Sequence, residues 1–142
     1  SAFAEAVAHR CGLEFSTDDR LREVAFGSWE GFSPDEIISR NRAEYEAFYR
    51  DPCRNRPAGA EALEDFGQRV AEALEDILSD CRGDHVLVVA HAGVVRAVLG
   101  YILNTDPIAW YRARIDNAAF TRLRKDQYGN RLEFHNRRRL EG

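Results

Sequence analysis

An apolar run of five residues, Val86 to Ala90, constrains the fold more than any other stretch of the chain. Its residues are aliphatic or small on both faces, which is typical of a strand buried on both sides in a mostly parallel sheet. His91-Ala92-Gly93 follows the run, and apolar residues then recur at helical spacing up to Ile102. The sequence therefore predicts a central strand over 86–90 and a helix that begins beside His91.

His91 is predicted to lie just past the carboxyl end of that strand, where open α/β sheets place their ligands. The free N–H groups at the start of the following helix favour an anion at the same point. An imidazole beside such a pocket suggests phosphate chemistry. On spacing alone, the alternative that His91 is a structural residue stays open.

The length and charge of the chain exclude several classes of protein. Its 142 residues, 44% of them hydrophobic, suffice for one domain with a real core. The net charge of −4 gives no general attraction to nucleic acid or a membrane surface, and no apolar run is long enough to span a bilayer. Cys11, Cys53 and Cys81 are odd in number and widely spaced, which favours free thiols in a reducing compartment. We therefore expect a cytoplasmic protein that binds neither nucleic acid nor membrane.

Caps and periodicity predict the remaining elements. Ser33-Pro34-Asp35-Glu36 supplies an N-cap, a proline at the first helical position and a capping box. The helix that it starts is expected to end near Arg50. The other expected elements are a helix up to Gly12, a loop over 13–32 with a short extended piece at 13–15, an amphipathic helix over 61–81, and two strands at 118–123 and 132–134 joined by a hairpin-like turn at 127–130. The chain starts inside a helical pattern without a Met or an N-cap, which suggests that it has been cut.

The sequence offers two carboxylates for acid–base chemistry and no metal site. His85 and His91 would lie roughly 20 Å apart on an extended strand, too far to share a metal. No other group of His, Cys, Asp and Glu has the spacing of metal ligands. Glu23 or Glu30 could act as a general acid if Phe26 and Trp29 exclude water from it. The alternative, that both are solvated loop residues, stays open on spacing alone.

Three segments, in this order, resemble motifs of the histidine phosphatase superfamily, which has the phosphoglycerate-mutase-like fold. Leu21-Arg-Glu23-Val-Ala-Phe-Gly27-Ser-Trp29-Glu-Gly31 is similar to its L-x-E-x-x-x-G-x-W-E-G. Pro57-Ala-Gly-Ala-Glu61 and Arg69-Val70 are similar to its G-E-S and R-V, with Ala62 in place of the serine. Val88-Val-Ala-His-Ala-Gly93 and Arg96 are similar to its V-V-x-H-x-G-x-x-R, and Asn117 and Asn136 also fit. The branch that the chain most resembles is the small bacterial phosphatases of the α-ribazole-phosphatase type.

The resemblance implies a three-layer α/β/α sandwich with a mostly parallel central sheet, and a two-step phosphoryl transfer through a phosphohistidine. Glu23 would donate a proton to the leaving oxygen. His91 would bind the phosphoryl oxygens, with the backbone N–H groups of Ala92 and Gly93 beside it as substrate-binding groups. The phosphatases of the family need no metal and no organic cofactor, and the expected partner is a small phosphorylated substrate or free phosphate.

The most serious departure from the family concerns the nucleophile. None of its four histidines stands in the Arg-His-Gly motif that supplies the nucleophile. We therefore expect a single domain, 1–142, that lacks the first strand, first helix and second strand of the family and is a poor or inactive phosphatase by itself. The loss of a strand would expose a sheet edge, through which the chain could form a homo-oligomer.

Three functions remain open after the resemblance. The first is a phosphomonoester hydrolase acting on a small phosphorylated metabolite. The second is a phosphotransferase of the phosphoglycerate-mutase type, which the short connections at 31–33 and 51–60 disfavour. The third is a non-catalytic module that binds a phosphorylated ligand or a protein partner.

Overall fold

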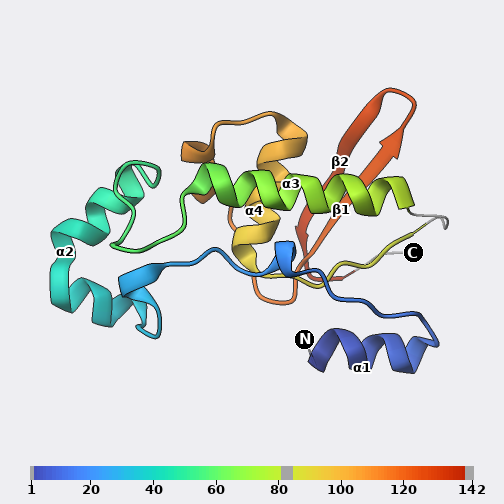
Figure 1. Cartoon of the computed structure of the whole chain (residues 1–142), viewed down its shortest axis with the longest axis horizontal. Helices are drawn as coiled ribbons and strands as arrows, with labels where there is room; N and C mark the ends of the chain where they lie inside the picture. Colours follow the sequence, from blue (N-terminus) through green and yellow to red (C-terminus); the bar gives the residue numbers. More distant parts are fainter. Residues whose placement is uncertain (1, 81–84, 140–142) are drawn as a thin grey trace.

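The computed structural model describes residues 2–80 and 85–139. Its elements are α1 (Ala2–Cys11), the 3-10 helices η1 (Asp19–Leu21) and η2 (Gly27–Trp29), α2 (Pro34–Arg50), α3 (Leu63–Asp80), α4 (Ala92–Leu103), the 3-10 helix η3 (Pro107–Arg112), β1 (Phe120–Asp126) and β2 (Gly129–Arg137). In Figure 1, α3 crosses the molecule with α4 against it, α2 lies at one end, and α1 and the hairpin of β1 and β2 lie toward the other. No helix in the described ranges is both long and apolar enough to cross a membrane.

The hydrophobic core lies where α3 and α4 meet. Every third or fourth residue of α3 is apolar, so one stripe of the helix is buried, as the sequence predicts. Buried side chains of α4 pack against that stripe, and the indole of Trp110, from η3, closes the cluster. The fully or nearly fully buried members of this core are Val24, Leu63, Phe66, Val70, Val94, Ala97 and Trp110. Cys81, at the expected end of the α3 helix, lies outside the described residues.

Trp110 fits into the core because two glycines make room for it. A Cβ atom added to Gly67 of α3 would lie 2.6 Å from the indole, and one added to Gly100 of α4 would collide with the indole nitrogen. Both glycines therefore serve close approach rather than backbone flexibility. No motif or spacing in the sequence singles out any of these three residues.

The capping box predicted at Ser33 is confirmed and sets the start of α2. The Ser33 side chain accepts from the Glu36 N–H, and the Glu36 carboxylate accepts from the Ser33 N–H at 2.8 Å. The helix is kinked at Asn41, whose φ of −154° and ψ of 84° are not helical. Phe48, 1% exposed, is the centre of an aromatic cluster that joins α2 to η2 and η3; its other members are Phe26, Trp29, Tyr45, Tyr49 and Tyr111.

The predicted late hairpin is confirmed, but its strands are longer than expected. β1 and β2 pair antiparallel up to Asp126 opposite Gly129, so the turn contains two residues only. Gly129, at a φ of +116°, supplies backbone geometry that other residues adopt rarely. Residues 124–126 of β1 and 129–131 and 135–137 of β2 lie outside the predicted strands because they are mostly polar or charged, whereas 118 and 119, predicted in the first strand, precede β1. An ion pair between Arg131 and Asp126 (3.0 Å) joins the two strands there.

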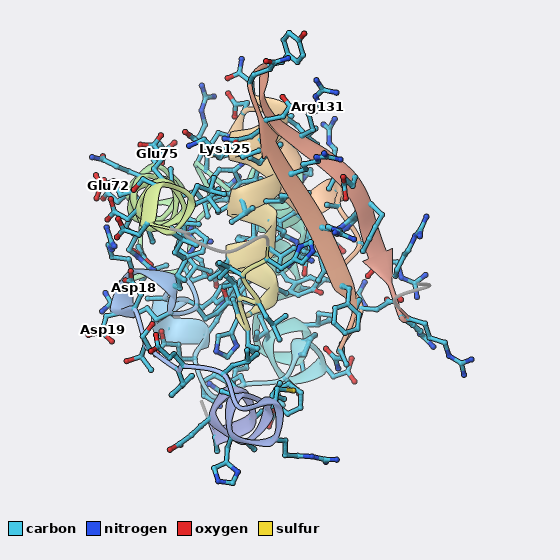
Figure 2. The ribbon with its side chains drawn as sticks, turned by 90° about the vertical axis from the view of Figure 1, so that its right-hand side faces the viewer. Asp18, Asp19, Glu72, Glu75, Lys125 and Arg131 are labelled. Carbon is cyan, nitrogen blue, oxygen red and sulfur yellow. The ribbon has the colours of Figure 1, made fainter. Side chains whose placement is uncertain are left out.

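Charged side chains are distributed unevenly over this framework. Figure 2 shows Asp18, Asp19, Glu72 and Glu75 together on one side of the molecule, away from Arg131 at the end of the hairpin. Arg20 lies between two of the acidic elements, because it pairs with Asp18 of the loop and with Asp76 of α3, both at 2.7 Å. These exposed ion pairs attach η1 to the outer side of α3.

The prediction that 86–90 is a buried strand is wrong for the described chain. No strand is present there, and the side chains of Val86, Leu87, Val88 and Val89 are 53%, 58%, 44% and 39% exposed. A strand forms only through hydrogen bonds to a neighbouring strand, and the described residues place none beside this segment. The extended piece expected at 13–15 is also not a strand. Within the described ranges the fold is therefore mixed α/β with one two-stranded sheet, and the three-layer sandwich is not seen.

The exposed segment Val86–Val89 has a measurable consequence. We expect the chain to self-associate through it. Its side chains form a contiguous apolar patch, and its backbone N–H and C=O groups have no neighbouring strand among the described residues, so both favour pairing with another chain. Light scattering on a size-exclusion column should show a mass above that of the monomer that rises with concentration, and the double variant Val86→Lys/Val88→Lys should shift the protein to the monomer. Tyr128→Lys, which removes an exposed aromatic ring (80%) at the hairpin turn, away from this segment, is the matched control and should leave the mass unchanged. A monomer at every concentration would contradict this expectation.

Candidate active site

His91 stands at the first turn of α4, as the sequence predicts. It is the N-cap residue, with extended backbone (φ −92°, ψ 167°), and its carbonyl accepts the Val95 N–H at 3.1 Å. The imidazole caps no backbone group and is exposed. A ligand at the helix terminus could therefore meet the ring without displacing a described hydrogen-bond partner.

Glu23 comes from a loop 70 residues earlier and reaches the same helix end. One carboxylate oxygen, Oε2, accepts the Gly93 N–H at 3.1 Å, and the other, Oε1, accepts the Val24 N–H at 2.9 Å. A carboxylate at a helix N-terminus is favourable, because it receives an otherwise unpaired N–H and faces the positive end of the helix dipole. Glu23 and His91, the two residues expected to be catalytic, are thus brought to one place.

Gly93 is needed for this contact. It is buried, and a Cβ atom there would collide with the Glu23 carboxylate, whose Cδ would lie 3.0 Å away. Any larger residue at 93 would push the carboxylate away from the helix end. The absence of a side chain therefore sets the distance between Glu23 and α4.

The two backbone groups expected to bind substrate differ in their availability. The Gly93 N–H already donates to Glu23, whereas no described residue accepts the Ala92 N–H. A phosphoryl oxygen arriving at the helix end would find the Ala92 N–H unpaired. It would share the Gly93 N–H with Glu23 or take it over.

An ion pair between Glu61 and Arg69 holds the loop that carries Glu23. The guanidinium of Arg69 donates to both carboxylate oxygens of Glu61 at 2.7 and 2.8 Å, and to the carbonyls of Arg22 and Glu23 at 3.0 and 3.3 Å. Glu61 in turn accepts the Ala25 N–H at 3.3 Å. The Arg69 hydrogen bonds hold the pKa of the Glu61 carboxyl below its usual value of 4.5.

Arg56 and Tyr111 form a second support on the other side of this loop. Arg56 donates from Nε to the carbonyl of Glu61 and from Nη2 to the carbonyl of Ala25, both at 3.0 Å. Its remaining Nη1 lies 3.5 Å from the Tyr111 hydroxyl. Burial raises the pKa of that phenol. Sequence reasoning gave Glu61 and Arg69 no role beyond their motif, and it passed over Arg56 and Tyr111; only the motif spacing drew attention to the first pair.

Glu30, the other candidate acid, has a different position. Its Oε1 accepts the Phe26 N–H at 3.1 Å, and the residue is exposed, so it closes the turn of η2. The aromatic residues expected to exclude water pack elsewhere: Trp29 stacks on Tyr45 at 5.9 Å, and the Phe26 ring is 6.3 Å from that of Phe48. Glu23 is therefore the carboxylate that the structure places at the helix end.

The remaining histidines of the described chain lie apart from this site. His135 is held between the Thr121 hydroxyl (2.9 Å) and the Arg114 carbonyl (2.8 Å), which gives it a structural role in the hairpin. His9 and His85 are exposed. Within 2–80 and 85–139 no three His, Cys, Asp or Glu side chains are grouped as metal ligands would be.

Comparison with known proteins points to one family. The family model described as "Histidine phosphatase superfamily (branch 1)" matches residues 2–138. A relative named "Putative phosphoserine phosphatase 2", from Hydrogenobacter thermophilus, is 25% identical over 134 residues, which cover 94% of this chain and 66% of that protein. The chain thus spans just under two thirds of that relative. A second relative, "Bifunctional protein Rv2228c" of Mycobacterium tuberculosis, is 29% identical over 118 residues, which cover 83% of this chain and 32% of that protein.

Solved structures agree on the fold. The structure described as Bacillus stearothermophilus YhfR superimposes with a TM-score of 0.84 at 25% identity and covers 96% of this chain and 68% of that one. The α-ribazole phosphatase from Shigella flexneri gives a TM-score of 0.79 at 21% identity, over 98% of this chain and 69% of that one. The mixed α/β arrangement described above is the one that these proteins share over the matched part.

Proposed function

The chain belongs to the histidine phosphatase superfamily, and on that premise we propose that it carries the proton donor and a phosphoryl-binding group of a phosphomonoesterase that acts on a small phosphorylated metabolite. One observation carries the proposal: the hydrogen bond from the Gly93 N–H to Glu23, which brings a carboxylic acid to the helix end that His91 caps. An acid, an imidazole and a helix N-terminus together are suited to the transfer of a phosphoryl group.

We propose the following roles for these groups. His91 and the Ala92 N–H bind the phosphoryl oxygens as negative charge moves onto them. Glu23 gives its proton to the leaving oxygen as the bond from phosphorus to that oxygen breaks and a bond from phosphorus to a histidine nitrogen forms. Water then attacks the phosphohistidine, and its proton returns to Glu23 while phosphate leaves. The nucleophile would come from an Arg-His-Gly segment of the whole protein, because the 142 residues contain none.

The proposal separates binding from turnover. The 142-residue chain should bind phosphate and simple phosphomonoesters but turn them over slowly, since acid catalysis alone supplies only about 10²–10⁴-fold. A variant extended by an Arg-His-Gly strand should gain activity on an aryl phosphate. If the extended and the given chain are equally active, the phosphohistidine route is wrong for this protein.

Replacing His91 by alanine should weaken phosphate binding by roughly ten- to hundredfold, the value of a hydrogen bond to a charged group. The measurement is a titration of the ¹⁵N-labelled chain with inorganic phosphate, followed by the amide shifts of Ala92 and Gly93. His9→Ala, which removes an exposed imidazole on α1, is the matched control. Binding that survives His91→Ala at full strength would remove His91 from the site.

Hydrolysis is the reaction that we favour over phosphoryl transfer between substrate positions. The connection from α2 to α3 is compact. The Asp51 carboxylate accepts the N–H groups of Cys53 and Arg54, and the Asn55 side chain donates to the Ala47 carbonyl. This connection leaves little room for an inserted segment that would contact the substrate. With the extended chain and a phosphorylated sugar acid, release of inorganic phosphate would support hydrolysis, and formation of an isomer would support the mutase. Phosphate binding without any turnover by the extended chain would favour the non-catalytic module.

A further inference from the structure

A cavity of about 350 Å³ lies between α3, α4 and η3, and the mechanism above makes no use of it. Its walls include Gly100 and Asn104 at the C-terminal end of α4, whereas His91 and Glu23 meet at the N-terminal end. The twelve residues of α4 separate the two ends by roughly 18 Å. The cavity is therefore a different place from the proposed phosphate site.

The polar groups that line the cavity are mostly hydrogen-bond acceptors. Glu64 is the one charged residue of the lining, and no ion pair of the described residues includes its carboxylate. The Gln68 amide donates an N–H to Glu72 at 3.0 Å, which leaves its own carbonyl oxygen available as an acceptor. Asn104 and Thr105 add an amide and a hydroxyl. Since no described Arg or Lys lines the cavity, a positive charge on a ligand would be favoured there.

The end of α4 adds to the negative character of this cavity. A helix carries a partial negative charge at its C-terminus, on the carbonyl groups that lack a helical partner. Asn104, in the left-handed conformation (φ 50°, ψ 52°), ends α4 and returns its N–H to the carbonyls of Gly100 and Tyr101. The last turn of α4 contains no basic residue to offset the remaining charge. The first turn of α4 thus favours an anion, and the last turn favours a cation.

The rest of the lining is small or aromatic. Ala71 of α3 and Ala97 of α4 have short side chains that leave the space open. The rings of Trp110 and Tyr101 line it as well, and the Tyr101 hydroxyl is held by a hydrogen bond to Glu75. Aromatic rings beside a carboxylate attract an organic cation. A metal ion fits less well, because within 2–80 and 85–139 no three His, Cys, Asp or Glu side chains are grouped as ligands.

We propose that this cavity binds a small organic amine in its protonated form, with the ammonium group at Glu64 and the carbon skeleton against Ala71 and Trp110. An ammonium group has three donors and no acceptor, so it can pair with the carboxylate and with the amide and hydroxyl oxygens at the same time. A neutral ligand of the same shape would gain the apolar contacts only. Nothing in this inference depends on the phosphate site at the other end of α4.

The test compares benzylamine, which is protonated at neutral pH, with benzyl alcohol, which has nearly the same shape and no charge. Titration of the ¹⁵N-labelled 142-residue chain is followed through the indole N–H of Trp110 and the backbone N–H of Thr105, both in the lining. Benzylamine should bind with a dissociation constant of about 1 mM, and benzyl alcohol about tenfold more weakly, the value of a hydrogen bond to a charged group. The indole N–H of Trp29, in the aromatic cluster of α2, should not shift with either ligand.

Three variants assign the preference to the cavity. Glu64→Gln keeps the shape and removes the charge, so the ratio of the two dissociation constants should fall to near one. Ala71→Leu fills the space without a change of charge and should weaken both ligands. Glu5→Gln removes an exposed acid on α1 and should leave the ratio as it is.

The possible outcomes are distinct. Equal binding of the amine and the alcohol overturns the inference, as does a preference that persists in Glu64→Gln or the absence of saturable shifts at Trp110. None of these outcomes touches the proposed function, which is tested with phosphate at His91. Circular dichroism on each variant shows whether it is folded. Should Glu64→Gln not fold, the loss of both ligands in Ala71→Leu, together with the ratio in the unchanged chain, decides the question.

Discussion

Replacing Arg69 by methionine should lower the free energy of unfolding by about 2–3 kcal/mol, less than the roughly 3–5 kcal/mol usual for a fully buried ion pair, because the pair with Glu61 is only partly buried. The side chains of Arg69 and Glu61 are only 15% and 17% exposed, so the variant leaves a mostly buried carboxylate without its cation. It also removes the donor to the carbonyls of Arg22 and Glu23. Urea unfolding followed by circular dichroism measures the change.

The chain offers a matched control for that loss. Arg42 pairs with Glu46 at 3.5 Å, but their side chains are 73% and 56% exposed, so Arg42→Met should cost under about 0.5 kcal/mol. The double variant Glu61→Leu/Arg69→Met should recover part of the loss, because no charge is then left buried, but not the part owed to the carbonyls. Equal stability of the Arg69 and Arg42 variants would show that the Arg69 hydrogen bonds to Glu61 and to the loop that carries Glu23 do not stabilise the fold.

The same pair gives a dependence on pH. Because Arg69 holds the pKa of folded Glu61 below the ordinary 4.5, the contribution of the pair is fully present above pH 4.5 and is lost as the pH falls through the folded value. The stability difference between the wild type and Arg69→Met should therefore be constant from pH 7 to 5 and shrink below pH 4.5. A difference that grows in acid would contradict the assignment.

Gly100→Ala should destabilise the protein by about 1–3 kcal/mol, although the intrinsic helix propensity of the two residues predicts a gain of about 1 kcal/mol. The sign is reversed because the new methyl group would collide with the indole of Trp110, whose Cε2 would lie 2.6 Å away. The indole is 7% exposed and enclosed between α3 and α4, so it has little room to move. Tryptophan fluorescence during urea unfolding reports both stability and the environment of the ring.

A second variant shows whether the collision is the cause. In the background Trp110→Leu, which has room for a methyl group, Gly100→Ala should cost much less or stabilise the protein. The coupling between the two positions should then exceed about 1 kcal/mol, well above the 0.3–0.5 kcal/mol expected of independent sites. Strictly additive effects would show that the close approach of Gly100 to the indole is not what the glycine provides.

Local signals predicted the helices well. The capping box at Ser33 gave the start of α2, and the apolar period after His91 gave α4, because caps and helical stripes depend on neighbours in sequence. The segment 86–90 was misjudged for the opposite reason. Its apolar residues favour burial, but burial in a sheet requires neighbouring strands. The composition of the segment does not show whether such strands are present.

The site was predictable only in part. Spacing alone placed His91 at a helix end, whereas Glu23 came to it through resemblance to a family, since nothing local shows that a loop glutamate reaches a helix 70 residues on. Trp110 was missed because its pocket is made by the missing side chains of Gly67 and Gly100, and a glycine in a helical pattern gives no sign of what approaches it.

The bond between Glu23 and Gly93 has a consequence for every affinity measured on this protein. Within the described chain the Gly93 N–H has one acceptor, the Glu23 carboxylate, which therefore occupies a position that a phosphoryl oxygen could take. An incoming phosphate therefore competes with the Glu23 carboxylate for the Gly93 N–H. The measured free energy of phosphate binding then includes the cost of breaking this internal hydrogen bond. Replacing Glu23 by a residue without a side-chain acceptor would thus lower the dissociation constant for inorganic phosphate, although it would also remove the proton donor that turnover needs.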